Sequence, residues 1–207
     1  MLLTISPDSA KICCRVTARR DLSTQSRRSG RRLCRSPVWS HIEPGGAAAL
    51  EAAAKRLAAA GAIVSELVLP DPFNGLMDAH AAIMHREGGV SFLPEYVNAY
   101  ALLAPSLRDK VDNANGVSSQ ALLESYALAD TCRPAFDALY AGSLDVVLTP
   151  SAPGEAPEGL HTTGSFIFNS IWTLLHVPCV TSPPAAGRAG CRWGCSWWGR
   201  DWRMPRC

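Results

Sequence analysis

The stretch Asp145–Pro157, DVVLTPSAPGEAP, decides how the rest of this sequence is interpreted. Its first six residues form a short apolar run, which is typical of a strand buried inside a sheet. The Pro and Gly residues that follow predict a loop at the carboxyl end of that strand. Because ligand sites in α/β sheets gather at this end of the strands, we expect a functional region near the loop.

The segments on either side alternate between helix and strand patterns. Strong helix formers fill residues 46–60 and space Leu50, Ala54 and Leu57 for one buried stripe, and a glycine follows to end the helix. The next nine residues, AIVSELVLP, predict a strand. After Pro157, we expect a helix near Phe166–Leu175 and a strand near Pro178–Ser182. This alternation of helices and strands along the chain indicates an α/β fold.

The middle of the chain predicts helices throughout. Residues 71–89, 94–103 and 106–112 all have helical patterns, and a longer pattern follows from about residue 114. Pro134 is expected to kink or divide this last helix. Its buried stripe consists of Leu122, Tyr126, Ala129, Cys132, Phe136 and Leu139.

Charge is distributed unevenly along the chain. Residues 1–35 hold nine of the twenty Lys and Arg residues, although the net charge of the whole chain is only +2. Such a basic arm is one way to bind nucleic acid or another anionic partner. The alternative is an atypical end without a fold of its own. We favour the second interpretation, because Arg19–Arg35 shows neither periodicity nor aromatic residues for base stacking.

Cysteine and histidine do not form a ligand pattern. Six of the eight Cys residues lie near the two ends, and Cys191 with Cys195 is a loose pair that has no second pair. His80 and His85 lack a carboxylate or thiol at ligand spacing on the same helix face, so we interpret them as structural. We expect no metal and no cofactor. No apolar run of about 18 residues is present and no secretory signal is visible, so we expect a cytoplasmic protein without a membrane span.

At this point the chain resembles a known family, the amidase signature enzymes, which are serine hydrolases that cleave carboxamides to acid and ammonia. The family includes bacterial amidases and the A subunit of the glutamyl-tRNA amidotransferase. The resemblance covers residues 33–187 and rests on the order of three segments. These are CRSPVWSHIEPGGAAALEAAAKRLAAAGAIVSELVLP, DVVLTPSAPGEAP and TGSFIFNSIWTLLHVPCVTSPPAAG. It implies the C-terminal portion of a mixed-sheet fold with covering helices, incomplete in this chain.

The last residues depart from the family pattern. The family continues with a Gly-Leu-Pro-Val-Gly-Leu-Gln-Leu-Val-Gly-Pro strand, whereas this chain has GCRWGCSWWGRDWRMPRC at residues 190–207. One permitted choice of G/C-rich codons for these residues, read from the third base, encodes LPVGLQLVGPGLADAAL. We therefore divide the chain into a basic segment (1–32), a partial amidase domain (33–187) and an out-of-frame tail (188–207). The alternatives are a genuine aromatic patch and a Trp-rich ligand platform.

The resemblance implies a nucleophilic Ser, a bridging Ser with a cis peptide and a Lys as ultimate base, all N-terminal to the portion present here. The adjacent serines Ser118 and Ser119 are poor candidates to replace these catalytic groups. They lack the neighbouring glycines that an oxyanion pocket needs, and a helix N-cap explains them better. Lys55 and Lys110 lie in segments where we expect solvation. We therefore predict no catalytic residue in this chain.

The same resemblance implies a small-molecule amide as the parent substrate. Its pocket candidates are Thr162, Thr163, Phe166 and Trp172, with a core position as the alternative for the two aromatic residues. His176 is interpreted as a structural hydrogen-bonding residue. We also expect a missing terminal strand, an exposed sheet edge and marginal stability. Neither the oligomeric state nor the particular amide follows from the sequence.

Overall fold

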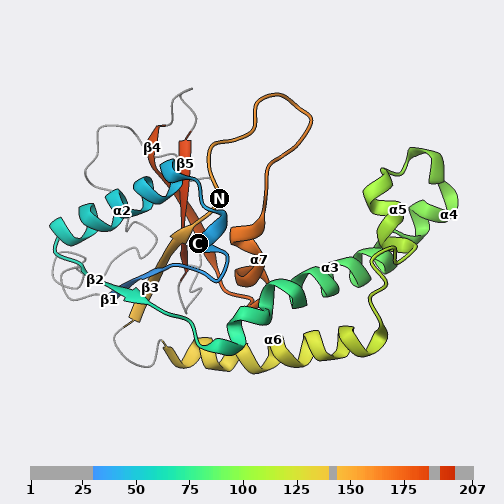
Figure 1. The fold of residues 1–207 in the computed structure, drawn as a ribbon, viewed down its shortest axis with the longest axis horizontal. Coiled ribbons are helices and arrows are strands. Elements are labelled where there is room, and N and C mark those ends of the chain that lie inside the picture. Colours follow the sequence, from blue (N-terminus) through green and yellow to red (C-terminus); the bar gives the residue numbers. More distant parts are fainter. Residues whose placement is uncertain (1–29, 140–143, 187–191, 199–207) are drawn as a thin grey trace, which may run out of the picture.

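A mixed five-stranded sheet forms the centre of the computed structural model, which describes residues 30–139, 144–186 and 192–198 (Figure 1). The strands are β1 (Gly30–Cys34), β2 (Ile63–Leu67), β3 (Leu144–Pro150), β4 (Cys179–Ala186) and β5 (Arg192–Trp198). They are arranged in the order β2-β1-β3-β5-β4. Strands β2, β1 and β3 are parallel, whereas β5 is antiparallel to both of its neighbours.

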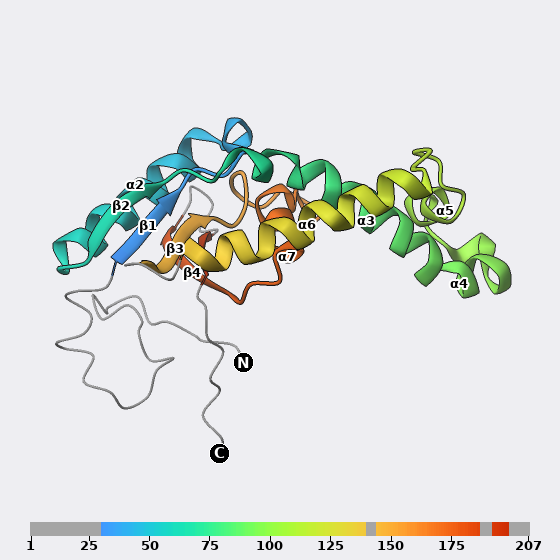
Figure 2. The same ribbon diagram turned by 90° about the horizontal axis from the view of Figure 1, so that it is seen from below.

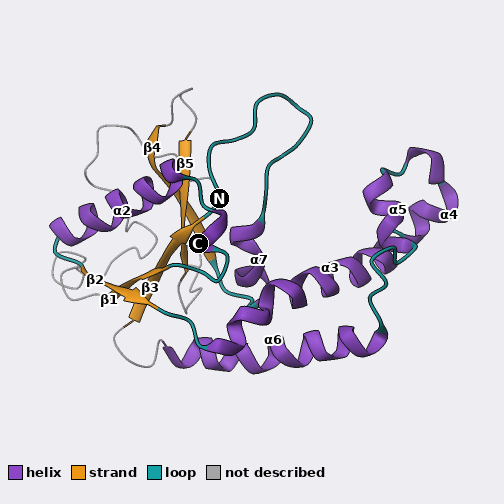
Figure 3. Ribbon diagram, viewed as in Figure 1, coloured by secondary structure: helices purple, strands orange, loops and turns teal. Residues whose placement is uncertain are grey.

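Helices cover both faces of this sheet (Figure 3). The α-helices are α2 (Pro44–Ala59), α3 (Leu76–Ser91), α4 (Leu93–Asn98), α5 (Pro105–Val111), α6 (Ser119–Leu139) and α7 (Ile167–Leu174). Short 3-10 helices occur at η1 (Trp39–His41), η2 (Asp71–Gly75) and η3 (Tyr100–Leu102). The α/β class and the mixed sheet predicted from the sequence are therefore confirmed.

The apolar run of β3 is buried because each of its faces meets a different helical layer. Val147 packs in the larger core cluster with α3, α6 and α7, whereas Leu148 packs against Leu50 and Ala53 of α2. Leu33 of β1 lies opposite Leu148 in the parallel register and contributes to the α2 side. A strand that is covered on both faces has no positions that face water, so apolar residues do not alternate with polar ones. This explains the continuous apolar sequence of β3.

Helices α3 and α6 form a long antiparallel arm that extends away from the sheet and carries α4 and α5 at its far end (Figure 2). The stripe predicted on α6 is confirmed, since Ala129, Cys132 and Phe136 are buried in the larger core cluster. Near the far end, α5 approaches α3 so closely that a Cβ at Gly89 would lie 2.5 Å from the Lys110 carbonyl oxygen. Only glycine permits this approach.

Pro134 does not divide α6, which runs as one helix from Ser119 to Leu139. The missing N–H of Pro134 removes one bond to the carbonyl of Asp130. Residues on both sides are nevertheless anchored, because Cys132 and Phe136 are at most 1% exposed. Core packing on either side outweighs the lost hydrogen bond. Of the two effects predicted for Pro134, a kink or a division of the helix, the division is wrong.

Both ends of the described fold differ from expectation. Strand β1 begins at Gly30, before the boundary expected at residue 33, and pairs with β2 and β3. The expected loss of the terminal strand is also wrong, because residues 192–198 form β5 between β3 and β4. Backbone groups make these ladders whatever the side chains are, and Trp favours strands. The rest of the predicted basic segment, 1–29, and the remainder of the tail lie outside the described residues.

Candidate functional site

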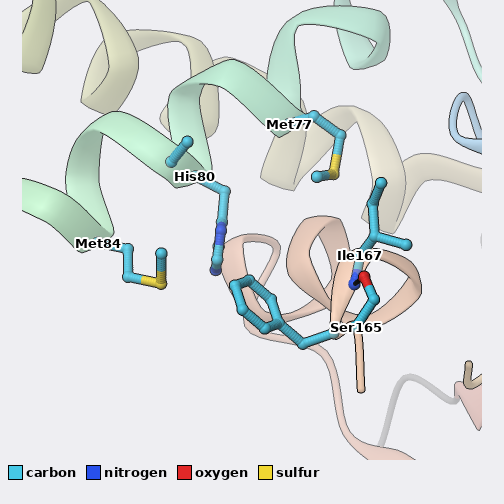
Figure 4. A pocket seen from close by; sticks show the side chains of 7 residues that line it. Met77, His80, Met84, Ser165 and Ile167 are labelled. Carbon is cyan, nitrogen blue, oxygen red and sulfur yellow. Dashed lines mark hydrogen bonds between the residues drawn. The ribbon is translucent and has the colours of Figure 1, made fainter. Parts of the chain in front are cut away.

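A pocket of about 280 Å³ lies between α3 and the start of α7 (Figure 4). Helix α3 contributes one wall, and the residues that lead into α7 contribute the other. Its lining is mostly apolar and consists of Met77, His80, Ala81, Met84, Ser165, Phe166 and Ile167. The two thioether side chains are flexible, so this surface can adapt its shape to a ligand.

The α3 wall follows directly from helical spacing. Met77, His80 and Met84 are separated by three and four residues, which places them on one face of the helix. The adjacent face is turned inward, where Leu76, Ala79 and Ile83 are buried in the core. Core packing thus fixes the rotation of α3 and presents the Met and His side chains toward α7.

The α7 wall depends on a turn. Gly164 has φ 85°, a conformation that favours glycine, and its N–H donates to Thr162 Oγ1 over 3.1 Å. The N–H of Ile167 donates to Ser165 Oγ over 3.3 Å. These local bonds reverse the chain so that Ser165 and Phe166 face α3.

His80 is the titratable member of the lining. Its ring centroid lies 6.2 Å from that of Phe166, with an interplanar angle of 53°. Burial lowers the pKa of His80 below its ordinary value of 6.5, and the positive charge of Lys110 lowers it further. The imidazole is therefore neutral at pH 7, with one nitrogen donor and one nitrogen acceptor.

Solved structures share this arrangement of sheet and helices. The chain superimposes on a crystal structure of an amidase with a TM-score of 0.71 and 19% identity, covering 83% of this chain and 42% of the amidase. It matches a bacterial aryl acylamidase, described as belonging to the amidase signature enzymes, with a TM-score of 0.65 and 16% identity over 86% of this chain and 41% of that one. This is the fold of the amidase signature enzymes.

Two further comparisons define the extent of this amidase fold. Over 127 residues the chain is 36% identical to 2-amino-5-chloromuconic acid deaminase of Comamonas testosteroni, which is 58% of this chain and 26% of the deaminase. The A subunit of glutamyl-tRNA(Gln) amidotransferase from Thermotoga maritima matches with a TM-score of 0.60 and 15% identity over 83% of this chain and 38% of that subunit. The chain thus spans about a quarter of its curated relative. No protein-family model matches it.

The four predicted pocket residues of the amidase fold occupy different environments. Phe166 lines the pocket and is 56% exposed, and Thr162 and Thr163 are exposed on the preceding loop. Trp172 is instead fully buried, with its ring centroid 5.7 Å from that of Phe136. The structure therefore places Phe166 at the pocket and Trp172 in the core behind it.

Sequence reasoning did not predict that His80 lines this pocket, because it assigned the residue to the structural histidines. The available signal was the helical spacing of Met77, His80 and Met84. This spacing shows that the three side chains share one face of a helix, but not that the face borders a pocket. His85, which was interpreted in the same way, is 4% exposed, and its Nδ1 lies 3.2 Å from Asn115 Nδ2. Only the second of these two histidines is enclosed by the amidase fold.

The loop after β3 is held by both helical layers. Asn169 of α7 donates to the carbonyl of Ser151 over 2.9 Å. On the α2 side, the backbone N–H of Glu43 donates to the carbonyl of Pro153 over 2.8 Å, and the Glu43 side chain lies against Gly154. The Pro- and Gly-containing loop is thus held at the carboxyl end of β3, as expected.

The rejected catalytic candidates have structural positions. The Ala121 N–H donates to Ser118 Oγ over 3.0 Å, which confirms the N-cap, and Lys55 is exposed. The interpretation of His176 is also confirmed, since its Nε2 accepts from the Arg133 guanidinium over 3.2 Å. In the searched part of the chain, no three His, Cys, Asp or Glu side chains group as metal ligands. Among the described helices, none has the length and apolar character that a membrane span requires.

The described part of the basic arm is occupied by contacts within the fold. Arg35 forms an ion pair with Glu66, and Arg32 Nη1 donates to the Glu66 carbonyl over 3.3 Å. Arg35 also lies over the Trp39 ring at 5.3 Å. Arg32 of β1 and Arg35, which follows it, therefore link this end of the arm to β2.

Proposed function

We propose that this chain provides the C-terminal framework of an amidase-type hydrolase and one wall of its substrate site. The parent reaction is the hydrolysis of a carboxamide C–N bond to a carboxylate and ammonia. The observation that carries this proposal is the match to an amidase over 83% of the chain, with the α3–α7 pocket formed by that matched fold. The substrate is a small-molecule amide, and no cofactor is required.

The chain does not perform the chemistry by itself. A serine nucleophile needs an adjacent base that accepts its proton. Ser118 Oγ is used as a helix cap, and Ser165 Oγ accepts from the Ile167 N–H. Lys55 is exposed to water on α2 and is not adjacent to either serine. None of these three side chains is placed as a nucleophile with an adjacent base.

Thr162, Thr163 and Phe166 contact the substrate in this proposal. Trp172 acts indirectly, because its burial against Phe136 of α6 anchors α7 and therefore helps to position Phe166 at the N-terminal end of that helix. The tail from residue 188 onward is read out of frame, and β5 takes the place of the family's terminal strand. Cytoplasmic placement also remains a prediction.

An ammonia-release assay on the purified 207-residue chain tests the proposal. We expect no release from benzamide above a protein-free blank between pH 6 and 9. Ser118→Ala and Ser119→Ala are matched variants, since they remove adjacent hydroxyls of which Ser118 caps α6. Ammonia release that disappears in either variant would show that the chain holds its own nucleophile.

A further inference from the structure

His80 is chemically distinct from the other side chains that line the α3–α7 pocket. Four neighbours, Met77, Met84, Phe166 and Ile167, offer thioether, aromatic or aliphatic surface. A volume of about 280 Å³ accommodates a substituted ring rather than a long chain. An aromatic group fits this lining, because both thioethers and aromatic rings interact favourably with its edges and faces.

The polar edge of the imidazole is available within this apolar lining. Figure 4 shows the His80 side chain extending from α3 into the space between Met77 and Met84, toward the segment that carries Ser165. The 6.2 Å distance and 53° angle to Phe166 describe a tilted ring pair. A ligand ring placed against Phe166 therefore has the imidazole within reach of its substituent.

The side chains that line the pocket favour a neutral polar partner, because none of them carries a formal charge at pH 7. Burial and Lys110 keep the ring uncharged at pH 7, as the lowered pKa of His80 indicates. From α7 and the residues before it, the pocket receives Ser165, Phe166 and Ile167, none of which is charged at this pH. A neutral imidazole offers both a donor and an acceptor, and a hydroxyl group can use either.

We propose that His80 is a specificity-determining residue, and that it selects an aromatic ring bearing a hydroxyl group over the same ring without one. This inference rests on the proposed function in one respect, because the ring is taken to belong to the amide substrate. Selection arises because a hydroxyl buried against Met77 and Met84 alone would lose its hydrogen bonds to water. His80 replaces those bonds.

Ligand-observed NMR titration of the full chain with benzamide and 4-hydroxybenzamide tests this directly. We expect the hydroxylated ligand to bind about 2- to 10-fold more tightly at pH 7.5, the range that one net hydrogen bond supplies. His80→Phe keeps a ring but removes both nitrogens, so the ratio of the two Kd values should fall to about 1. His80→Gln keeps a donor and an acceptor and should retain part of the preference.

The exposed His41 of η1 provides the matched control, since His41→Phe makes the same chemical change outside the pocket and should leave the ratio unchanged. Circular dichroism of each variant confirms that it is folded. An unchanged ratio in His80→Phe, or no binding of either ligand to the original chain, would overturn the inference. The ammonia assay is independent of this ratio, so the two proposals fail separately.

Discussion

The thiol of Cys34 is buried at the carboxyl end of β1, where burial and then the negative charge of Glu66 raise its pKa to about 12. Because the thiolate is the nucleophile, Cys34 should resist iodoacetamide at pH 8 in the native chain. Cys179 is exposed and should be modified. Peptide mass spectrometry measures both, with labelling in 8 M urea as the control. Equal native labelling would contradict the position of β1.

His80 makes the stability of the chain depend on pH. Its pKa is lowered in the folded state, so the unfolded chain binds the proton first as pH falls. The contribution of neutral His80 to the stability of the fold is complete above pH 6.5, the ordinary pKa of histidine. It decreases as the pH falls below that value.

Urea unfolding between pH 5 and 8 should therefore show a steeper loss of stability in the original chain than in His80→Phe. The His41→Phe variant should follow the original chain, since His41 is exposed. Parallel curves for the original chain and His80→Phe would mean that the pKa of His80 is not lowered in the folded chain.

Single residues were predicted well where local geometry decides their role. Ser118 could be identified as a cap because a cap needs only its own helix. The environments of His80 and Trp172 depend instead on which element covers them. The helical pattern places Phe166 just before a helix and Trp172 within it. It does not show that Trp172 contacts Phe136, or that Phe166 contacts His80.

At the scale of elements, α6 retains a proline that costs it stability. Pro134→Ala restores an N–H for the Asp130 carbonyl, and an interior proline costs a helix about 3 kcal/mol. Greater freedom of the unfolded chain offsets roughly 0.4–1 kcal/mol of this. We expect the free energy of unfolding in urea to rise by about 1–2 kcal/mol, allowing for strain already relieved by packing.

Pro105→Ala is the matched control for this change. Pro105 occupies the first position of α5, where a helix has no hydrogen bond to lose. The variant should therefore gain nothing. A fall in stability on Pro134→Ala would indicate that α6 depends on the proline for its shape.

The helices and β3 could be predicted because their patterns are local and strong. Strand β1 was harder, because GRRLC has two charged residues in a row and its burial comes from pairing with β2 and β3. The placement of β5 is a similar case, since it depends on the backbone edges that β3 and β4 offer. Pairing between distant segments leaves little trace in either segment alone.

At the level of the whole molecule, Trp172 of α7 packs against Phe136 of α6 in the core cluster that also contains Val147 of β3. Replacing this fully buried side chain with Ala should lower the free energy of unfolding by about 3–5 kcal/mol or prevent folding. Phe166→Ala removes a ring that is 56% exposed and should cost much less. Urea unfolding of the two variants compares them. Similar losses would place both rings in one environment.

Apolar side chains are exposed at the far end of the α3–α6 arm, among them Val90, Val97 and Leu102 at 76%, 70% and 89%. Such surface favours association between chains. We expect a low melting temperature in scanning calorimetry and a concentration-dependent tendency to aggregate. A cooperative, reversible transition at high temperature would contradict the expected marginal stability.

We propose that these residues are the C-terminal framework of an amidase whose chemistry is encoded elsewhere. Sequencing the genomic DNA from well upstream of codon 1 to beyond codon 207 tests it most directly. The account predicts a base gained or lost near Gly187–Gly190, and an upstream frame that encodes the Lys, the two Ser and the Gly-rich loop. An uninterrupted frame with nothing amidase-like upstream would contradict it and make the Trp and Cys tail a genuine part of the protein.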